Sequence, residues 1–185
     1  MSLSVVIFIF VVIILVFMYN SLIAKKNQVE NIFGSLDAML KKRYDLIPNL
    51  VASVSQYMEH EKSLLENVTK LRADANKPNI SEHQKIKLDA QVTSALGSIM
   101  IAVENYPDLK ANENVMHLQR SLNEIEEQIG AARRAYNQSV TDYNNAIEMV
   151  PTNFMANAMN YKRKEVFEIP QTQRENVNVK ELFAK

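Results

Sequence analysis

The 185-residue chain contains no cysteine and no tryptophan, and it has only three glycines and five prolines. Without cysteine it forms no disulfide, supplies no thiolate metal ligand and carries no cysteine-linked lipid anchor. Phosphate-binding loops and serine nucleophile elbows need several glycines close together, but Gly34, Gly97 and Gly130 stand far apart. The scarcity of both turn-forming residues favours long helices.

Patterns typical of catalytic or metal sites are also missing from the sequence. His60, His83 and His117 are widely spaced, and His60-Glu61 has no second histidine at helical spacing. Acidic pairs such as Glu126-Glu127 fall on the expected polar face of a helix, where charges usually contact only solvent. We therefore predict a protein that is not an enzyme and that uses no cofactor or metal.

The charge balance gives no sign of a polyanionic partner. Lys and Arg together number 21, as do Asp and Glu, so the formal net charge is zero. Such a chain has no global positive field to attract nucleic acid, and we predict no nucleic-acid binding.

The N-terminal segment, in contrast, has a strong signal. Residues 1–24 carry no charged side chain, and Leu3 to Phe17 is almost wholly Leu, Val, Ile and Phe. On an insertion scale this run favours bilayer placement by about 4 to 8 kcal/mol, and its length suffices to span hydrocarbon. A cleaved signal peptide is the alternative, but it fits poorly, since no Lys or Arg precedes the run and Leu22-Ile23-Ala24 is not a cleavage site. We predict a retained single-pass anchor.

Charge next to the anchor predicts its orientation. Lys25 and Lys26 directly follow the apolar run, and a second basic cluster lies at residues 41–43. The positive-inside tendency then predicts a cytoplasmic body, with an extracytoplasmic body as the alternative.

Apolar periodicity predicts an all-α body. A stripe at three- and four-residue steps runs from Val29 to Leu71 and is interrupted by no breaker but Pro48. We expect the anchor helix to continue into this stripe as one helix over 25–75, with a kink at Pro48 and a break there as the alternative. Ser81 with Gln84 resembles a capping box and opens a helix over 81–105.

The rest of the body follows the same pattern. A third stripe predicts a helix over 112–149, and a short helix follows at 152–160. The domain organisation is thus an anchor at 1–24, an antiparallel helical bundle at 25–160 and an irregular tail at 161–185. At 1.5 Å per residue the three long helices differ in length by tens of ångströms, so apolar overhangs would need cover. We expect copies of the same chain to supply it, as a homo-oligomer.

One segment breaks the local rules of a helix. Residues 41–51, with the sequence KKRYDLIPNLV, place three bases, an acid and a proline inside an otherwise strong helix. Pro48 leaves the carbonyl of Tyr44 without its helical partner, so a special packing site is expected here. We predict that Arg43 and Asp45 form a polar helix-to-helix contact with Arg133, Arg134 and Tyr136, either within one chain or between chains.

Two long runs, RYDLIPNLV at 43–51 and YPDLKANEN at 106–114, resemble motifs of the bacterial LemA family. Shorter matches support the resemblance: Tyr19-Asn20, Tyr57 with His60-Glu61, Ala132-Arg133-Arg134, and the Tyr-Asn pairs at 136–137 and 143–144. Lys26 and Phe33 depart from the usual arginine and tryptophan, and the lipoprotein cysteine that many relatives carry near Met18 is absent.

The resemblance implies a single-pass membrane protein with an antiparallel helical bundle and no assigned reaction. It also implies two functions. The first is a self-associating scaffold in membrane organisation, and the second is an adaptor or sensor bound to another membrane protein such as a membrane protease. The candidate interaction or packing residues for either function are Arg43, Tyr44, Asp45, Pro48, Asn49, Tyr106, Pro107, Asp108, Arg133, Arg134, Tyr136, Asn137, Tyr143 and Asn144.

Overall fold

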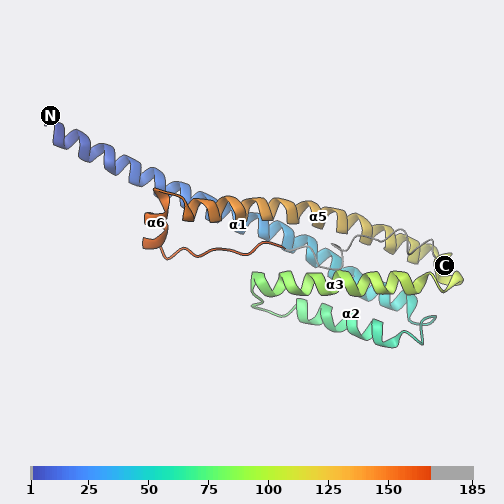
Figure 1. The fold of residues 1–185 in the computed structure, drawn as a ribbon. Helices are drawn as coiled ribbons and strands as arrows, with labels where there is room; N and C mark the ends of the chain where they lie inside the picture. The colour runs from blue at the N-terminus through green and yellow to red at the C-terminus, as the bar shows by residue number, and fades with distance from the viewer. Residues whose placement is uncertain (1, 168–185) are drawn as a thin grey trace, which may run out of the picture.

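The computed structural model describes residues 2–167, and this part of the chain is all-α, as predicted (Figure 1). The helices are α1 Leu3–Val54, α2 Lys62–Ala75, α3 Glu82–Val103, α4 Pro107–Lys110, α5 Glu113–Glu148 and α6 Thr152–Ala158. α5 runs antiparallel to α1 along most of the body, and the α2–α3 hairpin covers the part of this pair farther from the N-terminus (Figure 1).

α1 passes from the apolar N-terminal segment into the body without a break. Its large apolar side chains from Leu3 to Phe17 are exposed, whereas Leu22 is fully buried in the bundle. By length and composition α1 could cross a membrane, and it suggests a membrane anchor. α3 also passes that test, but it buries Val92, Ile99 and other residues in the core of the body.

The prediction of one helix over 25–75 is wrong in one respect. The helix continues through Pro48 but ends at Val54, and the chain reverses at residues 55–61 before α2 begins. Periodicity could not reveal this reversal, because Val54, Met58 and Leu65 are all buried at helical spacing on either side of the turn. The stripe therefore continues in sequence while the chain changes direction in space.

The boundaries of the later helices agree closely with those predicted from the sequence. Ser81 and Gln84 form the predicted capping box at the start of α3. Asn112 caps α5, since its side-chain oxygen accepts hydrogen bonds from the backbone N–H groups of Asn114 and Val115 at 3.0 and 3.3 Å. The YPDLK run, which lies between the helices predicted over 81–105 and 112–149, contains the single helical turn α4.

Residues 161–167 are non-helical and return along the α1–α5 pair (Figure 1). Asn160, with φ of 53°, redirects the chain from α6 into this stretch. The predicted tail is irregular in this part, and residues 168–185 lie outside the described residues. α6 and the returning stretch belong to the same chain, and with them in place Leu22, Val29 and Leu36 are fully buried. Our reason for expecting copies to cover this overhang therefore fails here, while self-association itself stays a prediction.

Candidate functional site

A buried ion cluster joins three helices in the middle of the body. Arg43 from α1 is 1% exposed and pairs with Asp89 of α3, whose side chain is also buried. Arg133 from α5 pairs with the other carboxylate oxygen of Asp89. Glu126 of α5 accepts from Arg43, and Thr93 of α3 accepts from the same guanidinium at 2.9 Å. The cluster thus ties α1, α3 and α5 together through charge-assisted hydrogen bonds.

The balance of charge explains how Asp89 can be buried. Burial raises the pKa of its carboxyl group, and Arg43 and Arg133 act against that rise. The neighbouring Tyr44 ring lies 5.8 Å from the Arg43 guanidinium, and burial raises the pKa of the Tyr44 hydroxyl to about 12. These groups are costly to bury singly, so each depends on the others being present.

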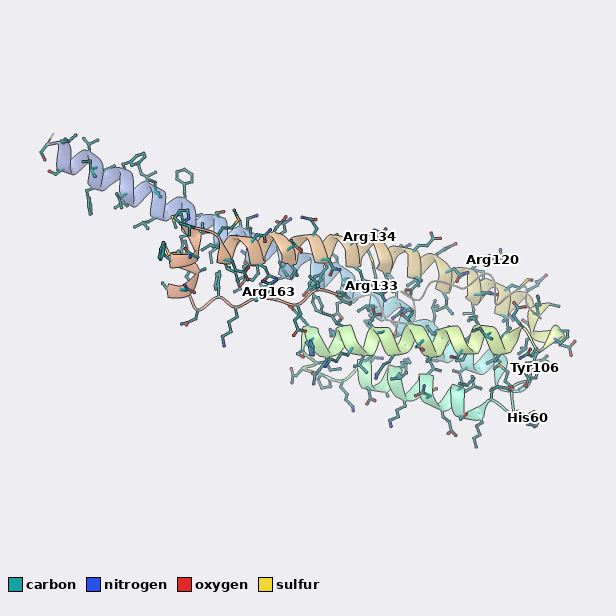
Figure 2. The ribbon with its side chains drawn as sticks, viewed as in Figure 1. His60, Tyr106, Arg120, Arg133, Arg134 and Arg163 are labelled. Atoms are coloured by element: carbon teal, nitrogen blue, oxygen red, sulfur yellow. The ribbon has the colours of Figure 1, made fainter. Side chains whose placement is uncertain are left out.

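The structure brings together only some of the residues that the sequence placed in this contact. Arg43 and Arg133 meet through Asp89 and Glu126, neither of which was a candidate. Asp45 instead lies on the exposed side of α1 and pairs with Lys41 at 3.3 Å. Arg134 is exposed and leaves α5 in a different direction from Arg133 (Figure 2). The exposed side chain of Asn49 also lies outside the cluster.

Pro48 has a partner that the sequence did not reveal. Proline at this position has no N–H to donate to the Tyr44 carbonyl four residues earlier. Arg72 of α2 donates its Nε–H to that same oxygen at 3.0 Å. The proline inside α1 is therefore matched by a cross-helix hydrogen bond that docks α2. Arg72 belongs to none of the sequence motifs, so the sequence gave no signal of this role.

Two asparagines of α5 hold the returning stretch 161–167 by its backbone. Asn144 donates to the carbonyl oxygen of Lys164 and accepts from its N–H, both at 2.9 Å. Asn137 does the same with Phe167, at 2.9 and 2.7 Å. Tyr143 adds a hydrogen bond from its hydroxyl to the Lys162 carbonyl at 3.1 Å. We call Asn137, Tyr143 and Asn144 the backbone clamp.

Tyr136 anchors the end of this stretch in the core. Its ring lies 5.3 Å from that of Phe167 and 5.6 Å from that of Phe33, so aromatic side chains from α1, α5 and the returning stretch meet. Its hydroxyl faces Glu82 of α3 at 3.5 Å, and burial raises its pKa. The Tyr-Asn pairs at 136–137 and 143–144 thus share one role, which is to hold residues 161–167 against the bundle.

The YPDLKANEN run closes the far end of the body. Tyr106 donates its hydroxyl to Glu61 in the α1–α2 turn at 2.6 Å, so two connections are tied to each other. Pro107 occupies the first turn of α4, with Asp108 beside it, as suits a helix N-terminus. Leu109 is fully buried beneath them. Figure 2 shows Tyr106 and His60 together at this end.

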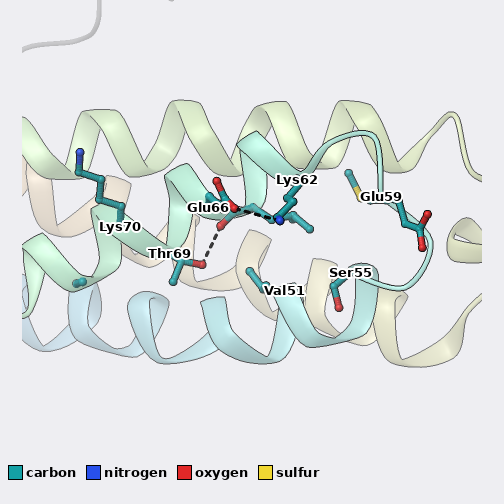
Figure 3. A pocket seen from close by; sticks show the side chains of 10 residues that line it. Val51, Ser55, Glu59, Lys62, Glu66, Thr69 and Lys70 are labelled. Carbon is teal, nitrogen blue, oxygen red and sulfur yellow. Dashed lines mark hydrogen bonds and ion pairs between the residues drawn. The ribbon is translucent and has the colours of Figure 1, made fainter.

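An open groove lies between α1 and α2 near the same end (Figure 3). Its floor is mainly apolar, with Val51, Met58 and Leu65, and charged side chains including Lys62 and Glu66 stand at its rim. Lys62 and Glu66 form an ion pair at 3.8 Å. Over residues 2–167, no three histidine or acidic side chains gather closely enough to hold a metal ion.

The chain is similar in sequence to several known proteins. Protein LemA of Metamycoplasma hominis is 25% identical over 163 residues, which is 88% of this chain and 74% of that protein. Magnetosome protein MamQ 2 of Paramagnetospirillum magneticum is 35% identical over 80 residues, and MamQ of Magnetospirillum gryphiswaldense is 34% identical over 79. Each of the two MamQ matches covers 43% of this chain and 29% of the relative.

The family model matches a longer stretch than the magnetosome proteins do. It describes the LemA family and covers residues 32–180, which includes both motif runs and the Tyr-Asn pairs at 136–137 and 143–144. Since this match extends over most of the sequence, the chain belongs to the LemA family.

Proposed function

We propose that this protein is a non-enzymatic, membrane-anchored scaffold that self-associates and takes part in organising a bacterial membrane. The buried polar side chains described above support a structural role, because Arg43, Asp89 and Asn144 all bond to other parts of the same bundle. The unbroken α1 adds support, since it makes the anchor and the body one rigid rod. The partial likeness to magnetosome proteins supports membrane organisation.

The outward face of α3 carries the proposal of self-association. From Ala90 to Val103 the helix has no charged residue, although one of its faces is open to solvent. Ile101 is 73% exposed on this face, and the exposed positions one turn apart before it are Gly97, Ser94 and Gln91. Small uncharged residues allow close approach of a second helix, and an exposed isoleucine gains from being covered. We propose a second copy of this chain as the partner at this face.

Gly97 provides a sharp test. A Cβ atom added at Gly97 meets no atom within 4 Å, the same holds for Gly34 on α1, and both positions are exposed to solvent. Replacing either helical glycine with lysine should stabilise the helix by several tenths of a kcal/mol, so neither variant harms the fold. In mild detergent the full-length protein should be larger than one chain, Gly97→Lys should reduce it to one chain, and Gly34→Lys should leave the assembly intact. A wild-type monomer would refute self-association, and an intact Gly97→Lys assembly would refute this face.

An adaptor or sensor for another membrane protein is the second candidate function. The open apolar groove between α1 and α2 favours it, because exposed apolar grooves on a single chain commonly mark interaction sites. The size measurement separates the two, since an adaptor that works as one copy would be monomeric in detergent before and after the Gly97→Lys change.

We also propose that the body lies on the cytoplasmic side, with the extracytoplasmic side as the alternative. Lys25 and Lys26 at the end of the apolar run support this orientation. Because the chain has no cysteine, Tyr57→Cys places one thiol in the exposed α1–α2 turn. A membrane-impermeant maleimide should label it after cell lysis but not in intact cells, and labelling of intact cells would reverse the orientation.

A further inference from the structure

α6 lies at the point where α1 leaves the body. It packs against α1 and the end of α5, and it runs across the direction of α1 rather than along it (Figure 1). Leu22 of α1 is fully buried at this end, and the Lys26 ammonium lies 5.9 Å from the centre of the Tyr161 ring just after α6. α6 therefore lies at about the level of Leu22 to Lys26 along α1.

This level coincides with the expected edge of the bilayer. Residues 3–24 form an uncharged helical stretch of about 33 Å, which is close to the roughly 30 Å thickness of bilayer hydrocarbon. Lys25 is the first charged residue on α1 and begins the region that must contact headgroups and water. α6 is therefore positioned beside the boundary between acyl chains and headgroups.

The start of α6 and the two residues before Pro151 expose three large apolar side chains there, beside uncharged polar residues such as Asn157. Met149, Val150 and Phe154 are 62%, 72% and 69% exposed, which is unusual for large apolar side chains in a body that buries most of its own. No charged residue occurs from Met149 to Tyr161, whereas charged residues occur immediately before and after, at Glu148 and Lys162. Within one rigid bundle, this apolar surface and the exposed apolar span of α1 adjoin one another.

We propose that α6 and the preceding Met149 and Val150 form a lipid-contacting foot, which inserts shallowly into the same bilayer that α1 spans. The exposed apolar side chains would be covered by the upper acyl chains, as happens with amphipathic segments that lie in a membrane interface. With two contacts, the span and the foot, the rod is fixed both in tilt and in rotation about α1. The inference rests on the membrane anchor and is independent of self-association through α3.

Tryptophan fluorescence can test the foot because the chain has no tryptophan of its own. Phe154→Trp puts one indole on the foot, Phe10→Trp puts one in the span, and Tyr57→Trp puts one in the exposed turn at the far end of the body. Each full-length variant is reconstituted into phosphatidylcholine and phosphatidylglycerol vesicles, with lipids brominated either near the headgroup or near the chain end. Bromine quenches indole on contact, so quenching reports depth.

Phe154→Trp should emit at shorter wavelength than Tyr57→Trp and should lose most intensity with shallow bromines. Phe10→Trp should respond most to deep bromines, and Tyr57→Trp to neither. A Phe154→Trp signal that resembles that of Tyr57→Trp would overturn the foot, because its surface would then face water. A shift to shorter wavelength without quenching would also overturn it, by showing that protein rather than lipid covers Phe154. Absence of quenching in Phe10→Trp would overturn the anchor itself, and the foot with it.

Discussion

Asn137 and Asn144 lie two helical turns apart on α5 and each hold both backbone groups of one residue in the returning stretch. Seven residues of helix rise about 10.5 Å, and three residues of extended chain span about 10 Å. The step from Asn137 to Asn144 therefore matches the step from Phe167 back to Lys164. Because the clamp bonds backbone atoms, it holds the chain in place without depending on the side chain of Lys164.

Replacing one asparagine of the backbone clamp should release the returning stretch. Asn144→Ala loses two hydrogen bonds of a buried side chain, and we expect the free energy of unfolding to fall by about 1 to 3 kcal/mol. Trypsin should then cleave faster after Lys162, Arg163 and Lys164. The neighbouring Asn145 is exposed, so Asn145→Ala should change neither quantity. Equal cleavage rates in the wild type and Asn144→Ala would show that the clamp does not hold the stretch.

The buried ion cluster should be far more sensitive than the exposed charges near it. Arg43→Met keeps most of the volume but leaves the Asp89 carboxylate with one guanidinium partner, so we expect a loss of about 3 to 5 kcal/mol in urea unfolding. Asp45→Ala, which removes only an exposed pair with Lys41, should stay within about 0.5 kcal/mol of wild type.

A double-mutant cycle separates this cluster from general damage to the core. If Arg43 acts through Asp89, combining Arg43→Met with Asp89→Asn should cost clearly less than the sum of the two single changes. Additive losses would mean that the two side chains stabilise the bundle independently, contrary to the geometry.

Stability should fall in alkali because buried tyrosines resist ionisation. Tyr44 ionises with a pKa of about 12 in the folded protein and about 10 when unfolded, so its contribution is fully present below pH 10 and is lost as the pH rises toward 12. Two pKa units correspond to about 3 kcal/mol. Tyr44→Phe should therefore flatten the fall in unfolding free energy between pH 10 and 12, while Tyr57→Phe in the exposed turn should not. An unchanged alkaline slope in Tyr44→Phe would contradict this assignment.

How much of this architecture could be predicted depends on how close together in the sequence the residues of each pattern lie. Short-range sequence patterns predicted the apolar span, the Ser81 capping box and the stripe of α5, and the structure confirms these three features. The reversal at 55–61 could not be predicted in this way, because Met58 and Leu65 continue the helical spacing across it. Distance in sequence also hid the partners of the candidate residues. Asp89 is 46 positions from Arg43, and nothing on its own helix marks it as the shared counter-ion.

The Tyr-Asn pairs show a further limit of sequence patterns. From the sequence we predicted a contact between helices for Tyr136, and an unspecified interaction or packing role for Asn137, Tyr143 and Asn144. Their partner is instead a non-helical stretch that lies about 20 to 30 positions downstream. Amide side chains that pair with backbone groups leave no complementary residue type to find, so such a partner can be found only in three dimensions.

Pro48 and Arg72 should be coupled, because the proline creates the acceptor that the arginine uses. Arg72→Met removes the hydrogen bond to the Tyr44 carbonyl, and we expect it to cost about 1.5 to 3 kcal/mol in urea unfolding. In a Pro48→Ala background the helix regains an N–H that can bond to the same carbonyl, so there Arg72→Met should cost less than half as much. Lys70→Met, on the same helix but without a contact to this carbonyl, should cost the same in both backgrounds. An Arg72→Met loss that is equal with proline and with alanine at position 48 would mean that Arg72 docks α2 by some contact other than the carbonyl that Pro48 leaves free.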